Sequence, residues 1–306
     1  MNTNLASTIT KAASKQTYFT IKYLADRDRV SDAFQAYAYF RWLDDAIDGQ
    51  AGSRDVSRAF LDRQKALLER AYAGLPVGIV HNPEAMLVDL IQGDQEVGSG
   101  LQIYLRNMMQ VMDFDASRRG RLVSRAELNQ YTFWLASAVT EAMHYFIGNA
   151  GASPHDDSRY LAVTGAHIVH MLRDTLDDLR AGYFNIPREV LEAGHFGPHD
   201  IHSGGYRSWV KTRVELARRN LRAGREYLAR VEEPRCRLAG SAYTTRFEKL
   251  LGMIEADDYA LRETYGEPKG VSTGLRLGVH ALLTALDLGI DKRASDSVAS
   301  HGWWRL

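Results

Sequence analysis

The sequence predicts an all-α protein, and three observations support this fold class. Only 7 of the 306 residues are proline, so long stretches are free of helix breakers. Within these stretches the apolar residues recur at spacings of three and four, which is the period of a helix with one buried face. The interruptions are short clusters of Gly, Pro, Asn and Ser. Because long helices joined by short loops can enclose one core, we expect a single domain over residues 1–306.

The apolar spacing places seven helices along the chain. They are expected at residues 30–47, 56–72, 83–94, 126–148, 158–181, 206–230 and 244–265. Gly49 and Gly182 follow the first and the fifth of these segments, where a glycine is typical of a helix C-terminus. Three loops, at residues 74–83, 149–154 and 195–205, separate the later helices.

Composition and charge exclude several classes of protein. A hydrophobic content of 45% with 25% charged residues indicates a soluble globular chain and excludes a disordered protein or a coiled-coil rod. The net charge is zero, so nothing in the total charge favours nucleic acid or an anionic membrane, and any function based on charge must be local. A single cysteine excludes a disulfide framework and fits a reducing cytoplasm. Charges interrupt the apolar segment at residues 271–290, which we interpret as an amphipathic helix, so we expect a cytoplasmic protein with at most peripheral membrane contact.

The first expected helix carries aromatic residues and carboxylates on one face. Counting by three and four along FQAYAYFRWLDDAIDG aligns Phe34, Tyr37, Arg41, Asp44 and Asp48, with Asp45 beside them. A solvated face would not normally carry the two aromatic rings, and a buried face would not carry three carboxylates unless something neutralised their charge. The pattern therefore indicates a bound cation.

A second acidic cluster follows the same arrangement. In GAHIVHMLRDTLDDLRAG a polar stripe runs through His167, His170, Asp174 and Asp178, while the other faces of the helix are apolar. One pair of aspartates a turn apart would most simply be a surface pair or a salt bridge. Two clusters that continue into aromatic or imidazole side chains favour a metal site instead.

The chemistry of these side chains favours magnesium. Carboxylates one helical turn apart have Cβ atoms about 5–6 Å apart, close enough to hold hard cations together. Oxygen ligands favour Mg²⁺ over zinc, and Mg²⁺ typically combines one or two carboxylates with the oxygens of a substrate phosphate. Facing acidic helices thus predict a diphosphate substrate. Arg41 and Arg173 stand beside the acids and suit phosphate oxygens, although Arg173 could instead pair with Asp177.

The two acidic clusters resemble the signatures of the squalene and phytoene synthases among the all-helical isoprenoid synthases. The first signature is similar to Tyr37-Ala-Tyr-Phe-Arg41 with the aspartates that follow it. The second is similar to His170-Met-Leu-Arg173-Asp174 with Asp177, Asp178 and Asn185-Ile-Pro187. Weaker matches are Ser14-Lys15, Met112-Asp113 and the segment from Tyr131 to Thr140, so the resemblance covers residues 10–265.

The resemblance implies a helical bundle with a central apolar cavity and a Mg²⁺-dependent prenyltransferase activity. An allylic prenyl diphosphate would ionise, and a second molecule would capture the carbocation in a dry, aromatic cavity. It implies metal ligands at Asp44, Asp45, Asp48, Asp174, Asp177 and Asp178. It implies substrate contacts at Ser14, Lys15, Tyr37, Arg41, Tyr131, His167, His170 and Arg173. Lys15 could also be a solvated residue of the terminus.

Several positions depart from the family pattern and bear on the acceptor. His167 and His170 replace the usual glutamine and asparagine, and Ser137 and Thr140 replace glycines. Glu141 lies in an apolar run, where it could act as a general base or be a hydrogen-bonded core residue. The family default is head-to-head condensation of two prenyl diphosphates. The departures leave open a prenyl transfer to a small aromatic or other non-isoprenoid acceptor.

Two functions of other classes remain alternatives. Glu141-Ala-Met-His144 and Glu192-Ala-Gly-His195 both fit Glu-x-x-His, the motif of di-iron helix bundles, although Gly194 makes a regular helix through the second copy doubtful. The iron interpretation predicts bound iron in the purified protein. A non-catalytic assembly role is the other alternative, and retention of the stripe aspartates argues against it.

Overall fold

The computed structural model describes residues 2–49, 54–148 and 152–265, and within these ranges it is built from helices, with no strand. The helices are α1 (Asn2–Ala13), α2 (Lys15–Leu24), α3 (Val30–Gly49), α4 (Arg54–Tyr72), α5 (Asn82–Gly93), α6 (Gly100–Arg118), α7 (Arg125–Phe146), α8 (Leu161–Arg173), α9 (Thr175–Ala181), α10 (Arg188–Gly194), α11 (Gly204–Ala229) and α12 (Pro234–Ala256). The all-α fold predicted from the sequence is confirmed. The segment at residues 271–290, expected to be an amphipathic helix, lies outside the described residues.

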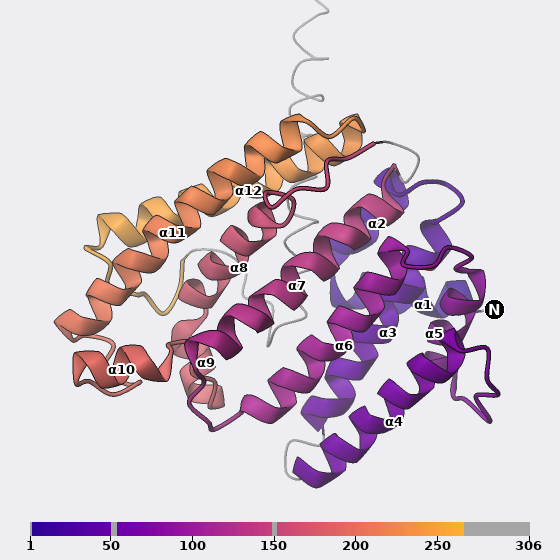
Figure 1. Cartoon of the computed structure of the whole chain (residues 1–306), viewed down its shortest axis with the longest axis horizontal. Coiled ribbons are helices and arrows are strands. Elements are labelled where there is room, and N and C mark those ends of the chain that lie inside the picture. The colour runs from indigo at the N-terminus through magenta and orange to yellow at the C-terminus, as the bar shows by residue number, and fades with distance from the viewer. Residues whose placement is uncertain (1, 50–53, 149–151, 266–306) are drawn as a thin grey trace, which may run out of the picture.

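The long helices lie side by side in one bundle (Figure 1). Helix α7 packs against α6 on one side and α8 on the other, and α8 also packs against α11 and α12. Helix α3 packs against α1 and α5 and also contacts α6. Buried apolar side chains from these helices form one continuous core.

Two glycines allow α8 and α11 to approach closely. A Cβ atom at Gly224 of α11 would lie 2.4 Å from the backbone nitrogen of Ala162, and one at Gly165 of α8 would lie 3.0 Å from the carbonyl oxygen of Ala217. Because these contacts involve backbone atoms, a side chain could enter only if the two helices separated. The pair fixes α8 firmly in the bundle, and with it the residues at both ends of that helix.

Two of the expected helices differ from the structure. The segment at 158–181 is divided at Asp174, which is both the C-cap of α8 and the N-cap of α9. The Thr175 hydroxyl donates to the Met171 carbonyl across this break at 2.7 Å. The last helix was expected at residues 244–265, but α12 begins ten residues earlier, at Pro234. Proline suits this start because its fixed φ is preorganised for the first helical turn. Helix α12 ends before Asp258 and Tyr259, which both have positive φ.

None of the described helices is both long enough and apolar enough to cross a lipid bilayer.

Candidate active site

The first acidic cluster lies at the C-terminal end of α3. Phe34 and Tyr37 are buried on this helix, and Asp44 is buried as well, while Asp45 is exposed. The Arg41 guanidinium lies between the two acids, with Nε 3.0 Å from Asp45 Oδ2 and Nη1 3.5 Å from Asp44 Oδ2. The backbone of Asp48 continues the helix, but its side chain lies outside the described residues. The mixed aromatic and acidic stripe predicted from the sequence is therefore a partly buried one.

The second acidic cluster surrounds the break between α8 and α9. The Arg173 guanidinium donates to both carboxylate oxygens of Asp174, with both nitrogen–oxygen distances 2.8 Å. Asp177 accepts from Arg180 at 3.1 Å at the surface. Arg173 thus pairs with its neighbour Asp174.

Asp178 is the acid of this cluster that burial affects most. Burial raises the pKa of its carboxyl to about 7, and the negative charge of Asp174 acts in the same direction. Two contacts oppose these effects: the positive charge of Arg118, and the Asn185 amide, which donates to Asp178 Oδ2 at 2.6 Å. The raised pKa indicates that these contacts leave the negative charge only partly compensated.

A buried arginine connects Asp178 to the end of α6. Arg118 donates to Asp115 Oδ1 at 2.7 Å and to Asn185 Oδ1 at 2.9 Å. Tyr131 of α7 donates its hydroxyl proton to Asp115 Oδ2 at 3.0 Å, and its ring lies 5.1 Å from the Arg118 guanidinium carbon. Tyr131 was expected in the site from the sequence, and Asn185 only as part of the second motif, whereas Asp115 and Arg118 were not expected there. An Asp–Arg pair three residues apart at the end of an apolar helix was the available signal.

The two histidines of the α8 stripe are buried behind the acidic cluster. The His167 ring lies 5.2 Å from the ring of Tyr131, and neither ring nitrogen has a hydrogen-bond partner among the described residues. Burial lowers its pKa to about 3, helped by the positive charges of Arg118 and Arg213, so the imidazole is neutral near pH 7. His170 packs its ring 4.7 Å from Phe247 of α12. Both histidines therefore belong to the apolar and aromatic layer next to the acids.

The structure holds Glu141 in an ion pair at the other end of α8. Arg159 donates to both Glu141 oxygens, at 2.6 and 2.8 Å, and the Tyr160 hydroxyl donates to Oε1 at 2.9 Å. Burial would raise the pKa of Glu141, but the hydrogen bonds and charge of Arg159 outweigh it and the pKa is lowered. Arg159 precedes α8 and Asp174 follows it, so about 20 Å of helix separates the ion pair from the acidic cluster. The structure does not bring Glu141 to the acids, and its partners match the alternative of a hydrogen-bonded core residue.

A pocket lies between α7, α8, α11 and α12 beside this ion pair. Its lining includes Val139, Thr140, Met143, Val163 and Leu228, with Arg159 at one side. Ser137, the other position where the family usually has glycine, accepts from Asn107 at 2.8 Å and so joins α7 to α6.

The di-iron alternative is not supported by the second Glu-x-x-His segment. Helix α10 ends at Gly194, and His195 has a left-handed backbone with φ of 51°, so Glu192 and His195 do not share a helical face. His144 of the first segment lies 2.9 Å from the Tyr227 hydroxyl through Nε2. Across the described ranges no three His, Cys, Asp or Glu side chains form a group that could hold a metal by themselves.

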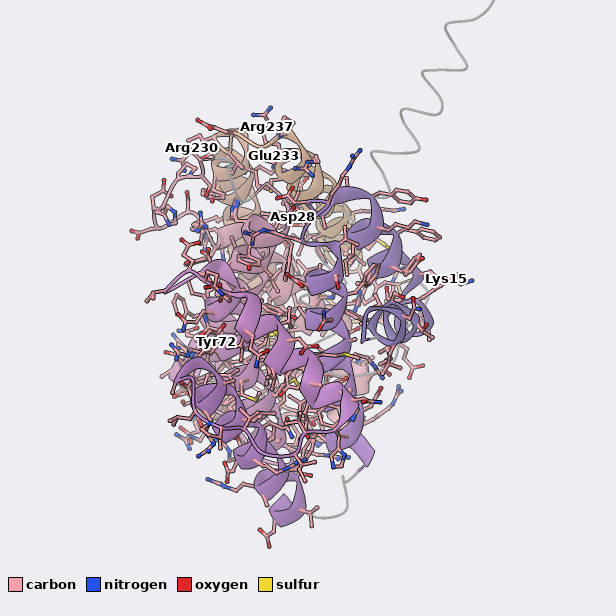
Figure 2. The ribbon with its side chains drawn as sticks, turned by 90° about the vertical axis from the view of Figure 1, so that its right-hand side faces the viewer. Lys15, Asp28, Tyr72, Arg230, Glu233 and Arg237 are labelled. Carbon is pink, nitrogen blue, oxygen red and sulfur yellow. The ribbon has the colours of Figure 1, made fainter. Side chains whose placement is uncertain are left out.

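Ser14 and Lys15, the two N-terminal residues expected to contact substrate, differ in their surroundings. The Ser14 hydroxyl caps α2 by accepting from the Thr17 backbone N–H at 3.1 Å. Lys15 extends outward from the body of the molecule (Figure 2). The C-terminal end of α3, which carries the first acidic cluster, and helix α9, which carries Asp177 and Asp178, both appear in the lower part of Figure 1.

Solved structures with the same fold come from related enzymes. A squalene synthase, HpnC from Alicyclobacillus acidocaldarius, aligns with a TM-score of 0.66 over 85% of this chain and 95% of its own, at 18% identity. A dehydrosqualene synthase aligns with a TM-score of 0.65 over 98% of this chain and 97% of its own, at 16% identity. At these identities the likeness establishes the fold.

The sequence is also similar to plant phytoene synthases. The enzyme of an Oncidium hybrid cultivar is 23% identical over 80% of this chain and 59% of its own length, and phytoene synthase 3 of Zea mays is 26% identical over 80% and 57%. The chain therefore spans less than two thirds of the length of these relatives. The model of the squalene/phytoene synthase family matches residues 10–271, which is most of the chain. With this match and the shared all-helical fold, the resemblance seen in the two acidic motifs is confirmed, and the chain belongs to the squalene/phytoene synthase family.

Proposed function

We propose that the protein is a Mg²⁺-dependent prenyltransferase that ionises an allylic prenyl diphosphate and joins the resulting carbocation to a second prenyl diphosphate. Membership of the family supports the reaction class. The observation that carries the proposal is the setting of Asp178, a half-buried carboxyl that stands one helical turn after Asp174, accepts from the Asn185 amide at 2.6 Å, and has its pKa raised to about 7 by burial and by Asp174. A divalent cation at this position would compensate the negative charge that its protein neighbours leave.

The donor set fits magnesium. The candidate ligands are carboxylates only, at Asp44, Asp45, Asp48, Asp174, Asp177 and Asp178. Mg²⁺ commonly takes one or two carboxylates and completes its coordination with water and substrate phosphate oxygens, so the site does not require three protein ligands at one point. When bound, Mg²⁺ would supply positive charge that stabilises the departing diphosphate.

The remaining residues have distinct roles in this proposal. Arg41 and Arg173, which now hold Asp44, Asp45 and Asp174, are placed to turn toward diphosphate oxygens once cations take over the carboxylates. Arg118 and Asn185 hold Asp178 in place through the hydrogen bonds described above. The rings of Tyr131 and the neutral His167 add an apolar surface beside the acids, where a carbocation would be kept from water.

The acceptor is a second prenyl diphosphate in this proposal, because head-to-head coupling is the reaction of the family. Glu141 was the candidate general base for a non-isoprenoid acceptor. Arg159 holds it in an ion pair away from the acids, which does not favour that role. Transfer to a small aromatic molecule is the alternative that the product analysis below tests.

The experiment measures diphosphate release and products together. The purified protein is incubated with dimethylallyl, geranyl, farnesyl or geranylgeranyl diphosphate, with Mg²⁺ or with EDTA, and with or without cell extract. We expect Mg²⁺-dependent release of diphosphate and, by mass spectrometry, a product with twice the prenyl carbon number. A product that forms only with extract would assign the acceptor to a non-isoprenoid molecule.

Matched variants test the site itself. Asp44→Asn and Asp178→Asn should each lower the release rate by about 10³-fold, because each removes charge that holds the cations. Asp62→Asn is the control, since Asp62 is an exposed aspartate of α4. Unchanged release in both site variants would contradict the proposal, and iron in the active protein together with no need for Mg²⁺ would favour the di-iron alternative.

A further inference from the structure

The N-terminal helices carry a local positive charge that the neutral chain as a whole does not have. Residues 2–25 contain three lysines, Lys11, Lys15 and Lys22, and no aspartate or glutamate, whereas the complete sequence has a net charge of zero. All three lysines are exposed. Helices α1 and α2 therefore present a basic surface on an otherwise balanced molecule.

One face of α2 combines these lysines with exposed aromatic rings. Lys15, Phe19, Lys22 and Tyr23 follow spacings of four, three and one, so they share one stripe along the helix, here named the α2 stripe. Phe19 is 45% exposed and Tyr23 is 59% exposed. Their rings are stacked, with centroids 6.2 Å apart and planes inclined by 8°. Two adjacent exposed rings have no role in the core of the fold.

The opposite face of α2 fixes the helix to the bundle. Thr17, Thr20 and Ile21 are buried, and the ring of Tyr18 lies 5.4 Å from the ring of Phe34 on α3. The Ser14 cap fixes the start of the helix. The α2 stripe is thus displayed on a rigid support, and a partner that covers it would not have to order this helix first.

The lysines surround the rings. Lys22 Nζ lies 5.5 Å from the centroid of the Tyr23 ring, and Lys11 Nζ lies 5.4 Å from that of Tyr18. Lys15 points away from the molecule at the edge of this surface (Figure 2). Aromatic rings flanked by lysines are suited to the boundary between lipid headgroups and acyl chains, where the rings enter the apolar layer and the ammonium groups meet anionic headgroups.

We propose that the α2 stripe, together with Lys11, binds the surface of a lipid bilayer that contains anionic headgroups. The charge selects the partner, because a basic stripe without acids attracts an anionic surface. The rings determine the depth of contact, because they are the large apolar side chains of the stripe. This contact is peripheral and does not depend on the proposed catalytic function.

Vesicle flotation of the full-length protein tests the proposal. One set of vesicles is phosphatidylcholine alone, and the other contains about 30% phosphatidylglycerol, enough to give a negative surface potential. We expect binding to the anionic vesicles to exceed binding to the neutral ones by about tenfold and to fall with added salt. Equal binding to both sets, or no binding to either, would overturn the proposal.

Two pairs of substitutions locate the contact. Phe19→Ser with Tyr23→Ser and, separately, Lys11→Gln with Lys22→Gln should each reduce binding to anionic vesicles about tenfold. The matched controls are Phe133→Ser, at an aromatic residue 51% exposed on α7, and Lys211→Gln with Lys249→Gln, at exposed lysines of α11 and α12. Because all of these side chains are exposed, circular dichroism should show an unchanged fold.

Other results would contradict the assignment. If the controls reduced binding as strongly as the stripe variants, the α2 stripe would not be the contact. If mass photometry showed that Phe19→Ser with Tyr23→Ser converts a dimer into a monomer while vesicle binding is unchanged, the stripe would be an interface between two copies of the chain. Because the readout is binding, none of these outcomes depends on whether the protein transfers prenyl groups.

Discussion

Two acids near opposite ends of α8, the buried Glu141 of α7 and the half-buried Asp178 of α9, have pKa values shifted in opposite directions. At one end, Glu141 accepts hydrogen bonds from Arg159 Nε and Nη2 and from the Tyr160 hydroxyl, and its pKa is lowered. At the other end, Asp178 receives the Asn185 amide and lies beside Asp174, and its pKa is raised to about 7. Burial acts to raise the pKa of both groups, so burial alone does not explain the difference.

The direction of the pKa shift distinguishes an acid that stabilises the fold from one that is available to bind a ligand. A buried charge that its neighbours neutralise completely stabilises one arrangement of the fold and has no capacity left for a ligand. An acid that is partly withdrawn from water and remains short of positive charge destabilises the protein until a cation or a proton arrives. Asp178 belongs to the second kind, which is why it carries the proposed function.

The largest effect is expected from substitution of Asp178, which should change catalytic activity without lowering the stability of the fold. Asp178→Asn should lower Mg²⁺-dependent diphosphate release by about 10³-fold, which is equivalent to about 4 kcal/mol of transition-state stabilisation. The same change removes a half-buried charge that Arg118 and Asn185 compensate only in part, so we expect the free energy of unfolding near pH 7 to stay equal or to rise. Initial rates measure diphosphate release, and urea unfolding measures the free energy of unfolding. A variant that loses stability together with activity would contradict the assignment of Asp178 as a functional acid.

Glu141 should show the reverse pattern. Glu141→Gln leaves the Arg159 guanidinium buried without a counter-charge, so we expect the free energy of unfolding to fall by about 3 kcal/mol. Diphosphate release per folded molecule should be retained, because about 20 Å of helix separates the ion pair from the acids. Urea unfolding and rates corrected for the folded fraction measure these effects. A loss of release in fully folded Glu141→Gln would restore the general-base interpretation.

Asn185 sharpens the comparison, because it bridges Arg118 and Asp178. Asn185→Ala removes the hydrogen bonds to both charged groups, and we expect a loss of about 2 kcal/mol in the free energy of unfolding. The Mg²⁺ concentration needed for half-maximal release should also shift, since Asp178 loses the group that orients it. A loss of stability with an unchanged Mg²⁺ dependence would make Asn185 purely structural.

The smallest expected effect concerns pH and the Glu141 end of the pair. Burial lowers the pKa of His144 to about 4, and the charge of Arg159 contributes. Since the folded pKa lies below the unfolded value of about 6.5, His144 stabilises the fold above pH 6.5, and this contribution is lost as the pH falls toward 4. Because the ring is only partly buried, we expect a loss of about 1–2 kcal/mol between pH 7.5 and 5.

His144→Gln provides the control for this pH effect. Arg159 Nη1 donates to the Tyr227 hydroxyl at 2.8 Å, so that hydroxyl can donate its own proton to His144 Nε2. Glutamine can accept the same hydrogen bond and does not titrate. Urea unfolding of both proteins at the two pH values isolates the histidine. An equal loss in both would assign the pH dependence to other groups.

Local patterns predicted the helical fold and the two acidic motifs, because a buried helix face and a run of aspartates are visible within one segment. The break at Asp174 was missed, since the residues around it are compatible with a continuous helix and a side chain–backbone hydrogen bond from Thr175 marks the division. The spacing of Asp115 and Arg118 could have indicated their pair, but the contact of Arg118 with Asn185 could not be predicted because the two are 67 residues apart. The interpretation of Glu141 stayed open for the same reason, as its partner Arg159 lies on another element.

The central claim is that both acidic motifs hold the same diphosphate through Mg²⁺. The most direct test is calorimetric titration of a non-reactive thiolo analogue of farnesyl diphosphate into the wild type, Asp44→Asn and Asp174→Asn, each with Mg²⁺ and with EDTA. Our account predicts Mg²⁺-dependent binding that either substitution weakens strongly, because each removes ligands from one shared site. Binding that persists without Mg²⁺, or that only one of the two motifs affects, would contradict it.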